Sequence, residues 1–229
     1  MLFRSLMLLI VVMVALAQQA QAKKRPKINV VQVHEPDNSF LLTTEANTYY
    51  TTNYANLSLE YSGADGFDIG LSSQNIPLSG TGDAQNYNED TYLQLSKTFN
   101  TDFGEISIGT QNGFHLGSEN VHKLHNFEYL DVLFDFDIIK IHTGSYYVNK
   151  ALSTVDNHVG FMSGIIVGNE NLYWQTDYFS GHTNVSGAQS AVYYRPYSFI
   201  KGYAGLLVPE TNSGNEFAGL LGIQLIFNK

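Results

Sequence analysis

The stretch Phe217-Ala-Gly-Leu-Leu-Gly-Ile-Gln-Leu-Ile-Phe227 lies near the C-terminal end of the 229-residue sequence and alternates with a period of two. One set of alternate positions is apolar or small throughout: Phe217, Gly219, Leu221, Ile223, Leu225 and Phe227. The other set is mixed and contains Gln224. Successive side chains of a strand point to opposite faces. The pattern therefore predicts a β-strand that separates two different environments.

The N-terminal residues have the features of an export signal. Arg4 supplies a positive charge, Leu6–Leu16 is apolar, and Ala20-Gln21-Ala22 matches a cleavage site. We therefore expect residues 1–22 to be a signal peptide, because the apolar run is shorter than the roughly 20 residues that a membrane-spanning helix needs. The sequence has no cysteine, so we expect neither a lipid anchor nor disulfides.

A C-terminal strand with a terminal aromatic, behind a signal peptide, resembles the closing strand of Gram-negative outer-membrane β-barrels. The match departs in one respect, because Asn228 and Lys229 follow the aromatic Phe227. The resemblance implies a place in the cell outer membrane, among lipid and lipopolysaccharide. It also implies recognition of the C-terminal strand by the barrel-assembly machinery. This architecture serves pores, lipid enzymes, adhesins and structural proteins, so the resemblance indicates location better than function.

The composition is consistent with an all-β protein. The sequence contains 20 Gly, 15 Tyr and 14 Phe, residues that favour strands and turns over helices. Only 14% of its residues are charged, below the usual quarter. The formal net charge of −9 argues against a nucleic acid partner, which would require a basic surface.

Alternating segments recur along the chain from residue 54 and are joined alternately by short links and long polar stretches. We expect eleven strands, within 54–61, 67–72, 91–99, 103–111, 126–135, 138–148, 158–167, 172–179, 188–195, 199–207 and 217–227. Short turns at one end and long loops at the other are typical of outer-membrane barrels, which have an even number of strands. We therefore predict a tail and first strand within 23–46 and a barrel over 47–229. The barrel would be antiparallel and up-and-down with about twelve strands, although ten or fourteen stay open.

The polar stretches 73–90, 112–125 and 149–157 are the expected outer loops. One hairpin also allows a register to be predicted. A two-residue turn at Phe136-Asp137 would place Phe134 opposite Ile139 and Asp131 opposite His142. In this register one face of the hairpin is largely apolar and the other face carries the charged side chains.

Alternation alone does not say which face is inside, because a soluble lipocalin-like barrel would bury the apolar face. Three features favour the membrane arrangement, of which the aromatic ending of the terminal strand is one. The polar face is rich in Gly, Ser, Tyr and Gln and poor in Lys and Glu. Aromatic residues also gather near strand ends, as in membrane-interface girdles. They are Tyr49, Tyr50, Tyr54, Phe99, Phe103, Tyr146, Tyr147, Tyr178, Tyr193 and Tyr194.

In a membrane barrel the polar face would line the lumen. The predicted pore-lining residues are Glu60, Asp68, Gln94, Glu105, Asp131, Asp135, Lys140, His142, Gln175, Asp177, Lys201 and Gln224. Acidic side chains favour cations or neutral polar solutes. Twelve strands lie between filled eight-stranded barrels and open sixteen-stranded ones, so both an open and a filled lumen are possible. Within this set, Asp131 and His142 could form a pH-sensitive constriction, but a structural pair is the preferred interpretation.

We predict no cofactor or metal. His115, His122 and His125 are expected to share one outer loop with Glu119 and Glu128, which suggests a metal site. Their spacing, however, matches no compact binding motif.

The leading function is a narrow passive channel for small polar or cationic solutes. A non-conducting structural or surface-interaction barrel is the alternative. An outer-membrane lipid hydrolase is third, with His142 and either Ser107 or Ser145 as the candidate pair. The predicted register turns Ser145 and His142 to opposite faces, and no Gly-x-Ser-x-Gly motif occurs. We therefore expect no enzymatic activity.

Overall fold

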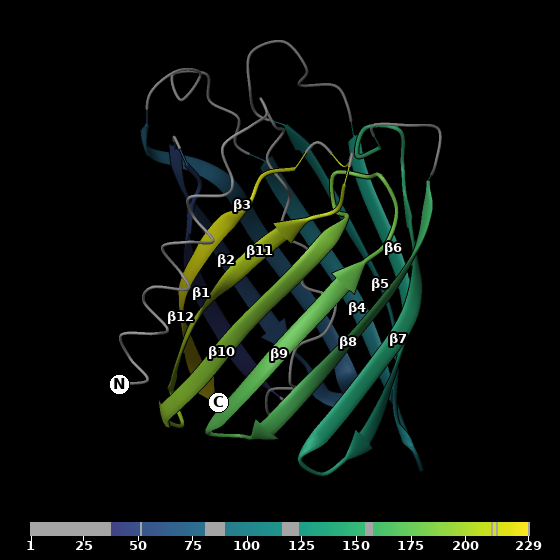
Figure 1. Ribbon diagram of the computed structural model, residues 1–229. Helices are drawn as coiled ribbons and strands as arrows, with labels where there is room; N and C mark the ends of the chain where they lie inside the picture. Colours follow the sequence, from purple (N-terminus) through teal and green to yellow (C-terminus); the bar gives the residue numbers. More distant parts are fainter. Residues whose placement is uncertain are drawn as a thin grey trace, which may run out of the picture.

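The computed structural model describes residues 38–50, 52–80, 90–115, 124–153, 158–211, 213 and 215–228. These residues form a closed barrel of antiparallel strands in which each strand pairs with its neighbours in sequence (Figure 1). The strands are β1 (Ser39–Thr48), β2 (Thr52–Ser62), β3 (Phe67–Gly80), β4 (Asp90–Thr101), β5 (Gly104–His115), β6 (Leu124–Phe136), β7 (Ile139–Val148), β8 (Val159–Asn169), β9 (Leu172–Phe179), β10 (Gly187–Tyr197), β11 (Ile200–Pro209) and β12 (Ala218–Asn228). A 3-10 turn, η1 (Ala64–Gly66), joins β2 to β3.

The C-terminal strand closes the barrel by pairing with both β1 and β11. Its alternation is the predicted one. Leu221, Ile223 and Phe227 are exposed on the outside, whereas Leu220 and Gln224 are buried on the inside. The first strand, β1, lies across the boundary that the sequence suggested between residues 46 and 47. The predicted signal peptide, residues 1–22, lies outside the described residues.

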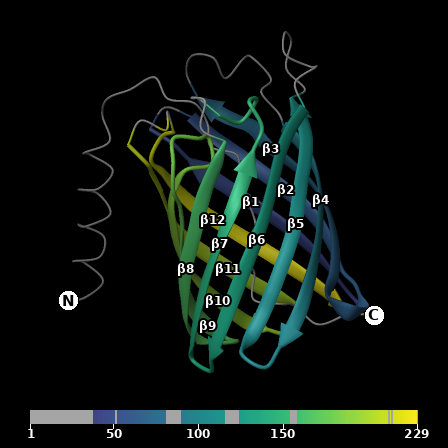
Figure 2. The same cartoon turned by 90° about the vertical axis from the view of Figure 1, so that its right-hand side faces the viewer.

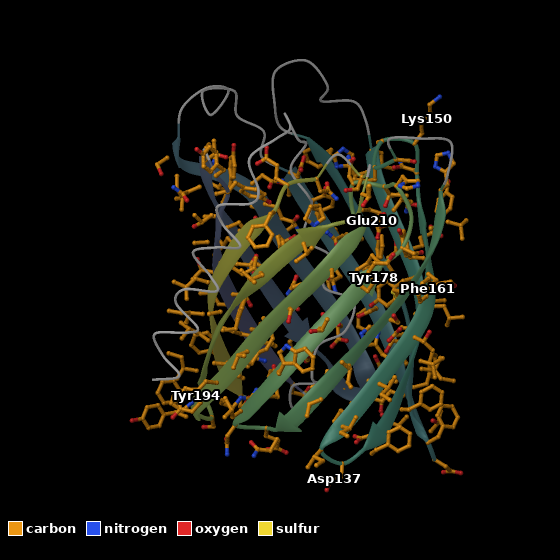
Figure 3. All side chains as sticks on the ribbon, in the orientation of Figure 1. Asp137, Lys150, Phe161, Tyr178, Tyr194 and Glu210 are labelled. Atoms are coloured by element: carbon orange, nitrogen blue, oxygen red, sulfur yellow. The ribbon has the colours of Figure 1, made fainter. Side chains whose placement is uncertain are left out.

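The two ends of the barrel differ in their connections (Figure 2). At one end, here called the short-turn end, only two residues separate β4 from β5, β6 from β7, β8 from β9 and β10 from β11. At the other end, the long-loop end, seven to ten residues separate consecutive strands, except between β1 and β2, where three residues do. Asp137 lies in a turn at the first end and Lys150 at the second (Figure 3).

The predicted register of β6 and β7 is wrong by two residues. The turn is Asp137-Ile138, so Phe136 pairs with Ile139 and Asp131 pairs with Gly144. Asp137 adopts a positive φ of 68°, and its backbone N–H donates to Asp135 Oδ1 at 2.9 Å. This local hydrogen bond stabilises a tight turn at Asp137. A slip of two residues leaves every side chain on its predicted face, because the period of a strand is two.

Two other boundaries also differ from the prediction. The stretch 73–90 was expected to be a loop, but β3 continues to Gly80 and pairs with β2 through two irregularities, at Asn53/Tyr54 and at Ala55/Leu57. The alternation of apolar residues does not predict this extension of β3, because its residues are largely polar. A strand needs an apolar face only where that face contacts lipid or a core. The last short turn, which the expected strands 188–195 and 199–207 would place at residues 196–198, is Ser198-Phe199, and the register shifts between Tyr194 and Tyr197.

The outer wall is apolar and is bordered by aromatic side chains. Those near the short-turn end are Phe40, Phe67, Phe99, Phe103, Phe136, Tyr194, Tyr197, Phe199 and Phe227, and those toward the other end include Tyr50, Phe114, Tyr147 and Phe161. Tyr194 projects from the lower edge of the wall (Figure 3). Such girdles mark the two membrane interfaces of a transmembrane barrel. The predicted fold class and the strand number of twelve are therefore confirmed. No helix within the described ranges has the length and hydropathy to cross a membrane.

Inward tyrosines lie over glycines on the neighbouring strand. At four directly paired positions a side chain in place of the glycine would overlap the tyrosine ring. The pairs are Tyr92 with Gly113, Tyr129 with Gly109, Tyr146 with Gly160, and Tyr203 with Gly222. A ring that covers a glycine fills the space beside the wall and shields the exposed backbone. This packing explains in part why both tyrosine and glycine are abundant in the sequence.

Candidate functional site: the barrel interior

The pairing register turns all twelve predicted lumen residues to the inner face of the wall. They differ in how deeply they lie. Asp131, His142, Gln175, Lys201 and Gln224 are buried, whereas the Asp135 side chain is 41% exposed at the short-turn end.

Carboxylates outnumber lysine and arginine on the described part of this inner face. The inward carboxylates are Glu45, Glu60, Asp68, Asp90, Glu105, Asp131, Asp135 and Asp177, and the inward cations are Lys140, Arg195 and Lys201. Lys140 and Asp135 are paired at 2.7 Å. The inner face is therefore acidic in total, as the sequence predicted.

His142 lies between two aspartates in the middle of the wall. Its Nδ1 is 3.2 Å from Asp131 Oδ1, and its Nε2 is 2.9 Å from Asp177 Oδ1. This arrangement suits an imidazolium ring, in which both nitrogens donate. Gln175 Nε2 donates to both oxygens of Asp177, at 3.2 and 2.9 Å. The predicted contact between Asp131 and His142 is thus present, although the two residues are not directly paired and a second aspartate completes the cluster.

Gly164 on β8 makes this cluster possible. His142 on β7 must reach across β8 to meet Asp177 on β9, and Gly164 lies directly between them in the register. A Cβ at Gly164 would overlap His142 Nε2 and lie 2.7 Å from Asp177 Oδ1.

We predict that Gly164→Ala destabilises the barrel by about 1–3 kcal/mol, the usual cost of overpacking. Gly202→Ala is the matched control, because its Cβ would meet no atom closer than 3.9 Å. Urea unfolding of both variants in detergent measures the difference. Equal midpoints for the two variants would contradict the proposed role of Gly164.

A second polar network crosses the opposite wall. Glu45 is 2% exposed and accepts hydrogen bonds from Asn56 Nδ2 at 2.9 Å and from Tyr203 Oη at 2.6 Å. Asn56 Oδ1 accepts from the backbone N–H of Asn75, whose side chain donates to Asp90 at 3.1 Å. The irregularity between β2 and β3 places Asn75 at a positive φ of 59° and leaves its side chain buried. This chain of hydrogen bonds joins β11, β1, β2, β3 and β4.

Three further charged residues face inward that were not among the predicted lumen residues: Glu45, Asp90 and Arg195. Glu45 lies on the same alternation as Leu41 and Thr43, which was a usable signal. Asp90 was assigned to a loop, and the shift in β10 register obscured Arg195.

The long-loop end of the interior contains an apolar cluster. Its members are Phe127, Tyr129, Tyr146, Val148, Leu152, Met162, Phe179 and Val185. Leu152 and Val185 come from the β7–β8 and β9–β10 connections, which are joined by a β-bridge between Ser153 and Thr183. The Tyr146 hydroxyl donates to the carbonyl of Ser180. The described residues of these two connections therefore pack against the inner wall.

The short-turn end contains a cavity of about 670 Å³. Glu105, Asp135 and Lys140 line one side, and Tyr173 and Arg195 line the other. Leu133 and Ile166 also line it, and both are buried. The lining of the cavity thus combines charged and apolar side chains.

Most of the suggested metal site lies outside the described residues. His125 faces inward, with its Nδ1 2.9 Å from the Tyr92 hydroxyl, whereas Glu128 is exposed on the outer face. Glu119, His122 and the side chain of His115 lie outside the described residues. Within the described ranges, no group of three or more His, Cys, Asp or Glu side chains could hold a metal ion.

No protein-family model and no curated protein matches the chain. Solved structures of outer-membrane barrels, however, resemble it. The KdgM porin superposes with a TM-score of 0.57 at 12% identity, over 82% of this chain and 99% of the porin. The NanC porin gives a TM-score of 0.55 at 12% identity, over 83% and 99%. The chain has the fold of these outer-membrane porins. At such low identity the likeness establishes the fold alone.

The porin fold is shared with an enzyme. The outer membrane phospholipase A of Escherichia coli superposes with a TM-score of 0.53 at 10% identity, over 89% of this chain and 95% of the enzyme. In the present chain His142 is buried inside and already bonded at both ring nitrogens, whereas Ser145 is on the outer face. Ser107 faces inward and is 2.9 Å from the Thr98 hydroxyl. Neither candidate pair has the geometry of a catalytic serine and histidine.

Proposed function

We propose that the chain is a narrow passive channel of the outer membrane for small cationic or neutral polar solutes. The excess of carboxylates over lysine and arginine on the inner face is the observation that carries the proposal. Fixed negative charges along a confined passage attract cations and exclude anions. The cavity at the short-turn end would be the vestibule on the periplasmic side, where outer-membrane barrels have their short turns.

Glu60 and Asp68 are the carboxylates best suited to a test, because they are partly exposed on the inner face. Glu60 accepts a hydrogen bond from Ser58 at 3.1 Å, and Asp68 accepts one from Ser96 at 3.3 Å. These serine hydroxyl donors hold both carboxylates in place on the inner face.

Recordings in planar bilayers under a KCl gradient test the channel. We expect discrete current steps with a reversal potential on the cation-selective side. Glu60→Gln and Asp68→Asn should each lower the cation-to-anion permeability ratio about twofold, since a unit charge about 8 Å from an ion in water contributes ~0.5 kcal/mol. Glu128→Gln is the control, because it removes a carboxylate from the outer face. Anion-selective steps would refute the proposal.

A non-conducting barrel that acts through its loops is the second candidate. The apolar cluster at the long-loop end favours it, because Val148, Met162 and Val185 are fully buried where a wide pore would leave them in contact with water. Bilayers that contain folded protein but show no current would support this candidate over the first.

A further inference from the structure

The outer wall contains a groove of about 560 Å³ across strands β4 to β7, on the side of the barrel turned toward the viewer in Figure 2. Leu95, Ile108 and Leu130 give the groove an apolar lining, and the short side chains of Thr110 and Ser145 leave space between them. Ile108 and Leu130 are 52% and 49% exposed. The volume is within the range of pockets that bind small molecules. The membrane-facing wall thus has an apolar groove of ligand size.

Lys97 lines this groove on the side of the short-turn end. Among the described strand residues, it is the only lysine or arginine on the outer face. Lys97 pairs in register with Phe67, the first residue of β3, and its Nζ is 5.6 Å from the centroid of the Phe99 ring. Both rings belong to the aromatic girdle near the short-turn end, and such girdles lie at the level of the lipid head groups. The ammonium of Lys97 is therefore placed where a phosphate would lie.

A backbone contact fixes the position of this ammonium. Lys97 Nζ donates a hydrogen bond to the carbonyl oxygen of Asp65 in η1. An ammonium has three N–H donors, so donors remain for a ligand outside the protein. Phosphate oxygens accept charge-assisted hydrogen bonds from such donors. Lys97 is thus preorganised to bind an anionic head group.

The far side of the groove has the opposite charge. Glu128 lines the groove there and pairs in register with Tyr147, which belongs to the girdle toward the long-loop end. A carboxylate repels a phosphate, so an amphiphile with a phosphate head would lie with that head at Lys97. The short turns of outer-membrane barrels face the periplasm. The favoured orientation therefore matches a lipid of the periplasmic leaflet.

We propose that this groove binds one phospholipid of the periplasmic leaflet. Its phosphate lies at Lys97, and one acyl chain lies along Leu95, Ile108 and Leu130. The occupant comes from the bilayer, because the outer wall of a transmembrane barrel faces lipid. The site is outside the lumen, so the inference goes beyond the proposed channel and does not depend on it. A barrel without current would still bind the lipid.

Native mass spectrometry of the full barrel in detergent tests the site with three matched ligands: dioleoylphosphatidylglycerol, dioleoylglycerol and glycerol 3-phosphate. The first has a phosphate and acyl chains, the second lacks the phosphate, and the third lacks the chains. We expect one phosphatidylglycerol per barrel, with a bound-to-free ratio about fivefold above that of dioleoylglycerol, the factor that one lysine contributes near an anionic lipid. Equal binding of these two lipids would overturn the inference.

The same measurement separates the other possible occupants. Binding of glycerol 3-phosphate as strong as that of the lipid would indicate an anion site without a lipid groove. Preferential binding of lipid A would assign the groove to the glycolipid of the outer leaflet. A dimer of barrels without bound lipid would assign it to a second copy of the chain. Each of these three results would overturn the proposal.

Charge variants test the head-group contact. Lys97→Gln should lower the bound-to-free ratio for phosphatidylglycerol about fivefold, and Lys97→Arg, which keeps the charge, should retain binding. Lys150→Gln is the matched control, because Lys150 is an exposed cation in a connection at the other end of the barrel. Equal losses in Lys97→Gln and Lys150→Gln would show a general effect of net charge and would refute the assigned contact.

Variants with a larger side chain test the acyl-chain contact. Ser145→Phe places a ring in the groove and should lower phosphatidylglycerol binding. Ala204→Phe adds the same ring at an exposed outer position on β11, outside the groove, and should leave binding unchanged. If the two variants bound the lipid equally well, the acyl chain would not lie in the groove and the proposal would fail.

Discussion

Replacement of His142 by leucine is expected to destabilise the barrel by about 3–5 kcal/mol, the usual cost of removing one partner from a buried ion pair. The His142 side chain is 1% exposed, and the side chains of Asp131 and Asp177 are 3% and 15% exposed. Without the ring, two carboxylates would remain inside the wall without their cation. Urea unfolding in detergent at neutral pH measures the loss.

Lys140→Leu is the matched control for this prediction. It breaks the pair between Lys140 and Asp135, whose side chains are 29% and 41% exposed. Exposed pairs contribute only about 0–1 kcal/mol. The triple change Asp131→Asn, His142→Leu and Asp177→Asn should recover most of the stability, because it removes the charges together. If His142→Leu and Lys140→Leu lost the same stability, the cluster would have no special structural role.

Val185→Asp is expected to release the β9–β10 connection from the inner wall. Val185 is 0% exposed, within the apolar cluster that includes Leu152 and Phe179. Burial of a valine side chain contributes about 2 kcal/mol, so its loss should raise the open population of this connection by a factor on the order of 30. Proteinase K cleavage within residues 180–186 of the folded barrel measures the change, since cleavage follows the open population when reclosing is fast.

His182→Asp controls for the new charge, because His182 is in the same connection but is exposed. Its cleavage rate should stay within a few-fold of that of the unmodified protein. In bilayers, Val185→Asp should also increase the current if the inward-folded connection narrows the passage. Unchanged cleavage in Val185→Asp would show that the β9–β10 connection is held by its hydrogen bonds rather than by Val185.

The face of each side chain could be predicted from the sequence, because the period of two is local. His142 and Asp131 were assigned to the inner face and Ser145 to the outer face, and the structure places them there. Each of these side chains lies on its predicted face although the predicted register of β6 and β7 was wrong by two residues. A shift in strand pairing by an even number of residues leaves every side chain on the same face of the sheet. The even strand number followed from the alternation of short and long connections.

The contacts within the interior could not be predicted in the same way. Asp177 lies 35 residues from His142, and the two meet only because β8 contributes Gly164 between them. Glu105 and Arg195 share a cavity only because the sheet closes on itself. The strands, their two faces and an acidic interior follow from the order of neighbouring residues along the chain, so they could be predicted. Which inward side chains meet depends on turn positions, register and closure of the barrel, and these are set only when the whole sheet has formed.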